Sequence, residues 1–281
     1  MIQRELKIYG GANKGGPGAA SAATPFDIEP IGAPGIHLLS GGTGVGKSVT
    51  ARNMVESYGE AHAKARTNPP PDVLIFTGAG GDPVWADMKE SDRVKKYTPQ
   101  NEQEFIDEVN RRYDRAMREK DEPPPPPPGK PGPKAASAHE ARADTMKAIL
   151  PQGHTADGDR AHRPTMVVVD DAASSSLFPT MMARSPIAQA VQSHRHGDMS
   201  FLISSQRYHA HNPWLRANAT SASIYPPRGK EETSFIKREI PIPHSALDRG
   251  FAVASANGPH NFIHVDVKNR KATHGFSGRE I

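Results

Sequence analysis

The chain has 281 residues, enough for one large domain or two small ones. Its hydrophobic fraction of 36% is low and its 27 prolines and 25 glycines are many, so part of the length is linker rather than core. A net charge of +4 does not by itself indicate a polyanionic partner, and the lack of cysteine excludes disulfides and thiolate metal sites. No apolar run reaches the roughly 18 residues of a membrane span, so we expect a soluble intracellular protein without a membrane partner.

Composition also indicates how the chain is organised. Residues 1–9 favour a short strand, but the Gly/Ala/Ser-rich stretch that follows has too few apolar side chains to fold alone, so we treat 1–30 as a flexible N-terminal lead. Residues 31–281 are then one domain. A run of six prolines cannot continue a helix and favours polyproline II, which predicts a surface insertion at about 121–163 with a short helix near 140–150.

Short apolar runs alternate with helix-like segments along the rest of the chain. We predict buried strands at 36–39, 73–76, 166–169 and 199–204. We predict helices at 48–58 (ending near Gly59), 101–120 and about 186–194. Beyond Thr220 the pattern predicts β segments at 234–240, 251–254 and 261–267. Strands that alternate with helices favour a mostly parallel sheet with helices on both faces.

The glycine-rich segment GGTGVGKS satisfies the phosphate-loop pattern G-x-x-x-x-G-K-[ST]. It lies between a predicted strand and a predicted helix, where backbone N–H groups and the helix dipole can surround phosphate oxygens. In this context Lys47 bridges the β- and γ-phosphates and the Ser48 hydroxyl ligates Mg²⁺. The nucleotide-binding residues that we predict are Gly41, Gly42, Thr43, Gly44, Val45, Gly46, Lys47 and Ser48.

Two adjacent carboxylates end the most β-like run, VVVDD. Asp170 suits a magnesium ligand acting through a bound water, and Asp171 suits the general base that orients the attacking water. The bland interpretation, a solvated turn after a core strand, would be favoured without the phosphate loop upstream. A second acid also distinguishes this site from those of most kinases and GTPases, and it favours a motor-type NTPase.

A glutamine ends the next predicted strand. An amide at the end of the strand beside the acidic one can reach the γ-phosphate or the attacking water, so we predict that Gln206 senses the γ-phosphate. Alone, a glutamine at a strand end is more often an ordinary surface residue.

These three motifs together resemble the FtsK–HerA superfamily of P-loop ATPases. Within it, RHGDMSFLISSQRYHAHNPWLRANATSASIY (195–225) looks like the poxvirus-type DNA-packaging ATPases of large DNA viruses. Those have Arg-His before the third strand, glutamine at its end, and then an arginine closely followed by asparagine, matched here by Arg216 and Asn218. VLIFTGAGGDPVW (73–85) also fits their second strand.

The resemblance covers about 32–120 and 164–226, and it implies a fold and a function. The implied fold is a three-layer α/β P-loop NTPase of the additional-strand, RecA-like type, with C-terminal β segments. The implied function is ATP hydrolysis with Mg²⁺ by a ring of about five or six subunits that drives double-stranded DNA into a capsid, with a capsid or portal vertex protein as partner. The implied location is the host cytoplasm or viral factory, with virion association left open. Asp171, where glutamate is commonest in the superfamily, the proline-rich insertion and the N-terminal lead depart from the family pattern.

Ring motors complete each site with an arginine from the neighbouring subunit. Arg195 is our first candidate because it leads into the strand that ends at Gln206, followed by Arg216 and Arg184.

Contacts to DNA should be made with phosphates. The basic candidates are Lys89, Arg93, Lys95 and Lys96, or Lys237 and Arg238, and solvated surface charge explains each cluster equally well.

The histidines do not predict a metal site. His194, His196, His209 and His211 are interpreted as exposed polar loop residues, since zinc needs three or four converging ligands.

Three other functions remain open. A cellular or plasmid DNA pump or helicase of the HerA or conjugation type fits less well with a short chain that lacks membrane helices. A small-molecule kinase does not explain Asp171 with Gln206, and intact Lys47 argues against a non-hydrolysing scaffold.

Overall fold

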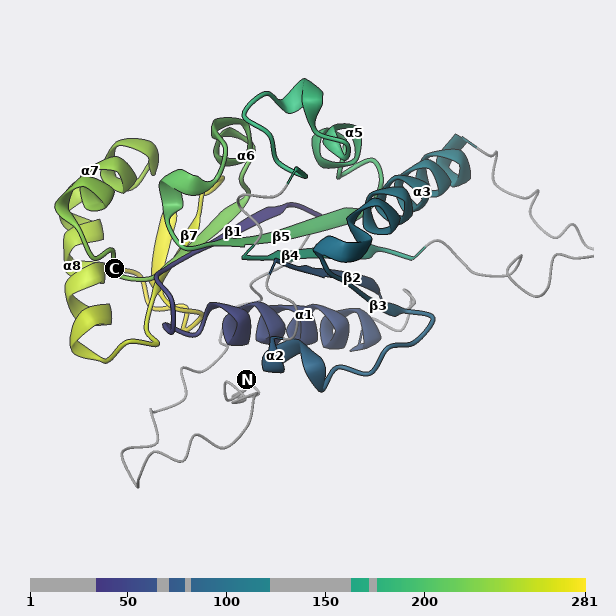
Figure 1. Cartoon of the computed structure of the whole chain (residues 1–281). Coiled ribbons are helices and arrows are strands. Elements are labelled where there is room, and N and C mark those ends of the chain that lie inside the picture. The colour runs from purple at the N-terminus through teal and green to yellow at the C-terminus, as the bar shows by residue number, and fades with distance from the viewer. Residues whose placement is uncertain (1–33, 65–70, 79–81, 122–162, 172–175) are drawn as a thin grey trace, which may run out of the picture.

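The structure, a computed structural model, describes residues 34–64, 71–78, 82–121, 163–171 and 176–281 (Figure 1). Eight strands of these residues form one sheet. In chain order they are β1 (Ile36–Ser40), β2 (Asp72–Thr77), β3 (Val94–Tyr97), β4 (Thr165–Asp170), β5 (Met199–Ser205), β6 (Ser221–Ile224), β7 (Ile263–Asp266) and β8 (Lys271–His274). The order across the sheet is β3-β2-β4-β5-β1-β6-β7-β8.

Helices lie on both faces of this sheet (Figure 1). The α-helices are α1 (Lys47–Lys64), α2 (Pro83–Ala86), α3 (Glu102–Asp121), α5 (Ala188–Gln192), α6 (Pro213–Ala217), α7 (Lys230–Glu239) and α8 (His244–Ala256). Short 3-10 turns are η1 (Pro99–Asn101), η2 (Met182–Arg184) and η3 (Tyr208–Ala210). Helices α1 and α2 cover one face, whereas α3, α5 and α6 cover the other. This is the three-layer α/β architecture that we predicted.

The strand order fixes where the motifs meet. Strands β3, β2, β4, β5, β1 and β6 pair in parallel, whereas β7 pairs antiparallel with β6 and β8 pairs antiparallel with β7. Strand β5 lies between β1 and β4, so an additional strand separates the phosphate-loop strand from the acidic strand. The predicted additional-strand type is therefore confirmed, and the carboxyl ends of β1, β4 and β5 share one edge of the sheet.

The two faces of β4 show how the sequence builds the core. Met166 and Val168 pack into one apolar cluster with residues of α1, whereas Val167 and Val169 pack into the cluster under α3 and α5. Successive strand residues point to opposite faces, so a run of valines is needed where both faces are covered. None of the helices that the structure describes combines the length and apolar character required to cross a bilayer.

Three predicted elements were wrong in type or extent. Helix α1 continues past Gly59 to Lys64 because a single glycine in a helix costs only about 1 kcal/mol. Segments 234–240 and 251–254 were predicted as β, but 234–239 belongs to α7, with Ile240 as its C-cap, and 251–254 belongs to α8. In α8 the buried residues recur at helical spacing, as Ala246, Leu247, Gly250, Phe251 and Ala254, whereas a short apolar run alone does not distinguish a helix from a strand.

Other predictions fall partly or wholly outside the described residues. These are the N-terminal lead with its strand at 1–9, and the interior of the insertion, 122–162, with its helix near 140–150. The predicted β segment at 261–267 is confirmed as β7.

Candidate active site

The phosphate loop connects β1 to α1 and has the backbone that its glycines allow. Gly44 and Gly46 have φ angles of 80° and 97°, which residues with a Cβ rarely adopt. The Gly41 N–H bonds to the Ser205 carbonyl at 3.2 Å, so the start of the loop is joined to the end of β5. Lys47 is buried, and its Nζ donates to the Gly42 carbonyl at 3.3 Å, which holds the ammonium over the loop.

Three side chains from the C-terminal third support this loop, and sequence reasoning missed all of them. The Tyr225 hydroxyl lies 2.7 Å from Thr50 Oγ1, Arg228 Nη2 donates to the Thr43 carbonyl at 3.4 Å, and His260 Nδ1 lies 3.0 Å from the Val45 carbonyl. A carbonyl only accepts, so the His260 contact requires hydrogen on Nδ1. No signal in the sequence reveals these contacts, because they depend on β6 and β7 lying beyond β1.

The acidic pair lies at the carboxyl end of β4, as predicted. Asp170 is buried, and its two carboxylate oxygens accept hydrogen bonds from Ser204 Oγ and from Trp85 Nε1, the latter at 2.8 Å. The Asp171 N–H donates to Ser204 Oγ at 2.9 Å. Asp171 has a φ of 51°, a left-handed conformation that aspartate tolerates better than most residues. This conformation ends the alternation of side chains between the two faces of the sheet, and the Asp171 side chain is exposed.

Gln206 follows β5 directly and lies beside the second acid. Its Nε2 is 3.4 Å from Asp171 Oδ2, and both side chains are exposed. In the register of the sheet Ser205 is paired with Ser40, the last strand residue before the phosphate loop. The acidic strand is two strands from β1, or roughly 10 Å. The three predicted motifs therefore meet at one edge of the sheet.

The donors here suit a magnesium ion. Ser48 and Asp170 offer hydroxyl and carboxylate oxygens, which are the ligands Mg²⁺ prefers. In the part of the chain that the structure describes, no three His, Cys, Asp or Glu side chains gather as a metal cluster. Mg²⁺ usually keeps several waters and needs only one or two protein ligands with substrate phosphates, so these residues fit it.

Arg195 lies at the opposite edge of the sheet. Strand β5 has seven residues, so Arg195 before it and Gln206 after it are roughly 20 Å or more apart. Arg195 is exposed, and its carbonyl accepts from Lys120 Nζ at 3.5 Å. It cannot serve the site of its own subunit. Arg184 is also exposed, in η2.

Arg216, the second candidate, is held inside its own subunit. Its Nε lies 3.2 Å from Glu239 Oε2, its Nη1 donates to the His211 carbonyl, and its guanidinium lies 4.9 Å from the centre of the Phe235 ring. These contacts indicate a structural role.

Two histidines expected to be exposed are buried instead. His194 Nδ1 donates to the Val191 carbonyl at 2.8 Å. His211 Nε2 lies 3.0 Å from Ser40 Oγ and 3.1 Å from Ser205 Oγ, so it joins the ends of β1 and β5 next to the phosphate loop. Desolvation lowers the pKa of His211 to about 3, which keeps the ring neutral. Tertiary packing decides this burial, and the local sequence around both residues is polar.

Several basic candidates for DNA contact also have internal partners. Lys95 pairs with Glu108 at 3.1 Å, Lys96 Nζ donates to the Trp85 carbonyl at 3.2 Å, and Lys237 pairs with Asp248 at 2.6 Å. Lys89 and Arg93 are exposed. Among the residues that the structure describes, these basic candidates therefore do not mark one DNA-binding surface.

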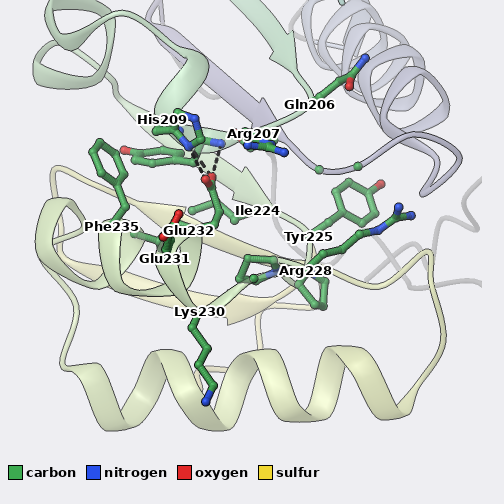
Figure 2. Close-up of a pocket in the computed structure, with 18 of the residues that line it drawn as sticks. Gln206, Arg207, His209, Ile224, Tyr225, Arg228, Lys230, Glu231, Glu232 and Phe235 are labelled. Atoms are coloured by element: carbon green, nitrogen blue, oxygen red, sulfur yellow. Dashed lines mark hydrogen bonds and ion pairs between the residues drawn. The ribbon is translucent and has the colours of Figure 1, made fainter.

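A cavity of about 760 Å³ opens beside the first half of the phosphate loop. Figure 2 shows Gln206 and Arg207 on one side of the loop and Tyr225 and Arg228 on the other, with the start of α7 further away. There Glu232 accepts from the Tyr208 N–H at 2.6 Å, which ties α7 to the segment after Gln206. The cavity is lined by both acidic and basic side chains, so its charge is mixed.

Comparison with known proteins places the fold. No protein-family model and no curated protein matches the chain. Among solved structures, the genome packaging NTPase B204 from Sulfolobus turreted icosahedral virus 2, in complex with sulfate, is 13% identical with a TM-score of 0.53, over 86% of this chain and 95% of that one. B204, the DNA-packaging ATPase from Sulfolobus turreted icosahedral virus, is 12% identical with the same TM-score, over 86% of this chain and 97% of that one.

A weaker likeness, with a TM-score of 0.46 and 15% identity, links 72% of the chain to 35% of the cytoplasmic domain of EssC. The two B204 structures and the strand order agree with the resemblance drawn from the motifs. The chain therefore has the same α/β fold as these two genome-packaging ATPases.

Proposed function

We propose that this protein is an ATP-hydrolysing translocase that packages double-stranded DNA into a capsid. The observation that carries the proposal is the meeting of three elements at one sheet edge. These are a buried lysine on a phosphate loop, an acidic pair on β4, and a glutamine hydrogen-bonded to the second acid. A kinase or a GTPase does not require this second acid with its amide partner.

In this proposal the loop binds the triphosphate of ATP. The Lys47 ammonium would exchange its hydrogen bond to the Gly42 carbonyl for contacts with oxygens of the β- and γ-phosphates. Ser48 and Asp170 would hold Mg²⁺, which would neutralise charge on the phosphates. His211, Ser40 and Ser205 keep the start of the loop in register with the end of β5.

The exposed pair Asp171 and Gln206 then positions the attacking water. The Asp171 carboxylate accepts the proton of the water. The Gln206 amide, which is hydrogen-bonded to Asp171 in the ligand-free structure, contacts the γ-phosphate when ATP is bound. Loss of the γ-phosphate would return the amide to Asp171. Because Gln206 lies between β5 and η3, its movement would report hydrolysis to both elements.

We predict that Asp171→Asn binds ATP but hydrolyses it about 100- to 10,000-fold more slowly, the usual contribution of a general base. Asparagine tolerates the left-handed backbone of this position, so the fold should persist. Single-turnover hydrolysis and binding of a fluorescent ATP analogue measure the two effects separately. Wild-type hydrolysis by Asp171→Asn would exclude Asp171 as the base.

We further propose that Arg195 acts on the site of a neighbouring subunit in a ring of about five or six copies. Arg195→Ala and Asp171→Asn should then each be inactive alone, yet partly active when mixed. In a mixed ring, roughly a quarter of the interfaces join an intact Asp171 to an intact Arg195 across a head-to-tail contact. Activity of the mixture no higher than that of the two single variants would exclude the trans arginine.

The function itself is tested by ATP hydrolysis with and without double-stranded DNA, and by ATP-dependent displacement of a third strand from a DNA triplex. Stimulated hydrolysis with displacement is the expected result. The cavity beside the loop could instead hold a phosphate acceptor, so the assay includes nucleosides. Phosphorylation of a nucleoside, without stimulation by DNA, would identify a kinase. A cellular or plasmid DNA pump of the HerA type would also displace the strand, and binding to a capsid or portal vertex protein separates it from a packaging motor.

A further inference from the structure

One hydrogen bond at the acidic strand has no part in the scheme above. The indole Nε1 of Trp85 donates to Asp170 Oδ2 at 2.8 Å, and only 2% of Trp85 and 3% of Asp170 are exposed. Ser204 Oγ donates to the other oxygen of the same carboxylate. A carboxylate has about four acceptor positions, so these two donors fix its orientation and leave one position on each oxygen open.

The indole reaches Asp170 from a short helix that is anchored on two sides. The Asp82 carboxylate caps α2 by accepting from the Val84 N–H at 2.9 Å. Arg52 of α1 donates to the Val84 carbonyl, and Lys96 of β3 donates to the Trp85 carbonyl at 3.2 Å. The ring also packs in the apolar cluster between α1 and the sheet. Trp85 is therefore a fixed donor, and it cannot follow Asp170 if that side chain moves.

The second tryptophan shows the ordinary alternative. Trp214 satisfies its indole N–H with the Pro179 carbonyl at 3.3 Å, a backbone partner away from the acidic pair. A buried tryptophan needs some acceptor, so burial alone explains a partner of that kind. The indole N–H of Trp85 instead donates to the buried carboxylate at the end of β4. A hydrogen bond to a charged acceptor is about twice as strong as one between neutral groups.

We propose that Trp85 is a positioning residue for the magnesium ion, which makes its emission a reporter of metal binding. The inference rests on the proposed function, since it takes Asp170 as the carboxylate that faces Mg²⁺. Mg²⁺ requires near-octahedral geometry, so a carboxylate that rotates freely binds it more weakly. Partners that orient a metal ligand typically change metal affinity about 10- to 100-fold.

The first test compares Trp85→Phe with Trp214→Phe, which removes the other indole and leaves Asp170 untouched. We expect Trp85→Phe to raise the Mg²⁺ concentration for half-maximal ATP hydrolysis about 10-fold or more. Binding of an ATP analogue in EDTA should stay at the wild-type level in both variants, and Trp214→Phe should keep the wild-type Mg²⁺ dependence. A Mg²⁺ titration of Trp85→Phe that superimposes on wild type would overturn the inference.

The second test leaves Trp85 in place, so it does not depend on the folding of Trp85→Phe. In Trp214→Phe the only remaining tryptophan is Trp85. With a non-hydrolysable ATP analogue bound, adding Mg²⁺ should shift the Trp85 emission, and EDTA should reverse the shift. Asp170→Asn in this background should abolish it. Unchanged emission on adding Mg²⁺ would overturn the inference.

These outcomes separate the inference from the proposed function. If wild type hydrolyses ATP with Mg²⁺ but Trp85→Phe has the same Mg²⁺ dependence, only the role of Trp85 is wrong. If wild type hydrolyses no ATP under any condition, the proposed function is wrong, and the inference fails with it.

Discussion

Replacing Lys47 with alanine should reduce ATP hydrolysis at least about 100-fold, because the ammonium is the one loop cation placed to meet charge developing on the γ-phosphate. In the described structure Lys47 Nζ bonds only to the Gly42 carbonyl of its own loop. The variant therefore loses little that holds the fold together. Steady-state release of phosphate measures the effect.

Two comparisons make this result specific. Lys268→Ala changes an exposed lysine in the turn between β7 and β8, and it should hydrolyse ATP like wild type. Thermal unfolding of the nucleotide-free protein should be nearly the same for Lys47→Ala and wild type, whereas stabilisation by added ATP should be lost only in Lys47→Ala. If Lys47→Ala hydrolysed ATP at the wild-type rate, the phosphate loop would have no role in the reaction.

Acid should destabilise this protein steeply, because three buried histidines are neutral in the folded state. Desolvation lowers the pKa of His37 to about 3, with repulsion from His264 and His194 adding to it. Desolvation also lowers the pKa of His264 to about 4 and that of His211 to about 3. His37 bonds to Ser221 Oγ at 2.8 Å and His264 to Ser223 Oγ at 2.9 Å, contacts that a neutral ring provides.

The direction follows from which state binds the proton. In the unfolded chain these histidines titrate near pH 6.5, so below that pH they bind protons when unfolded but stay unprotonated in the folded state. Each ring then costs up to about 1.4 kcal/mol per pH unit, until the pH reaches its folded pKa. By pH 5 the three together cost on the order of 5 kcal/mol, comparable with the stability of a whole domain.

Denaturant unfolding measured from pH 8 to pH 4 tests this expectation. The free energy of unfolding should be nearly flat above pH 7 and fall below pH 6.5. In His264→Gln the free energy of unfolding should fall less steeply with decreasing pH, because unfolding takes up about one proton fewer than in wild type. In His244→Gln, which changes an exposed residue, it should follow wild type. Equal slopes for His264→Gln and wild type would show that His264 is protonated in the folded protein.

The reactive part of the site could be predicted from sequence because it follows a rule of parallel sheets. Lys47, Asp171 and Gln206 each follow the carboxyl end of a strand, and those ends share one edge. The residues that orient them could not be predicted. Trp85 reaches Asp170 only because α2 folds back under the sheet, and His211 is buried only because β1 and β5 are neighbours.

The C-terminal part was harder for a different reason. Ile236 of α7 and Ile240, which caps its C-terminus, lie four residues apart and both are buried. This is a helical spacing, within a segment short enough to be taken for a strand. Arg228, before α7, and His260, in the loop before β7, contact the phosphate loop from this part of the chain. Such contacts depend on the order of strands across the sheet, which no local pattern specifies.

The most direct test of the site is a crystal structure of the full chain with Mg²⁺ and a non-hydrolysable ATP analogue. We predict that Lys47 contacts the β- and γ-phosphates, that Asp170 faces the metal, and that the side chains of Asp171 and Gln206 flank the γ-phosphate. A triphosphate bound away from Lys47, or a γ-phosphate that neither Asp171 nor Gln206 approaches, would contradict the proposed mechanism.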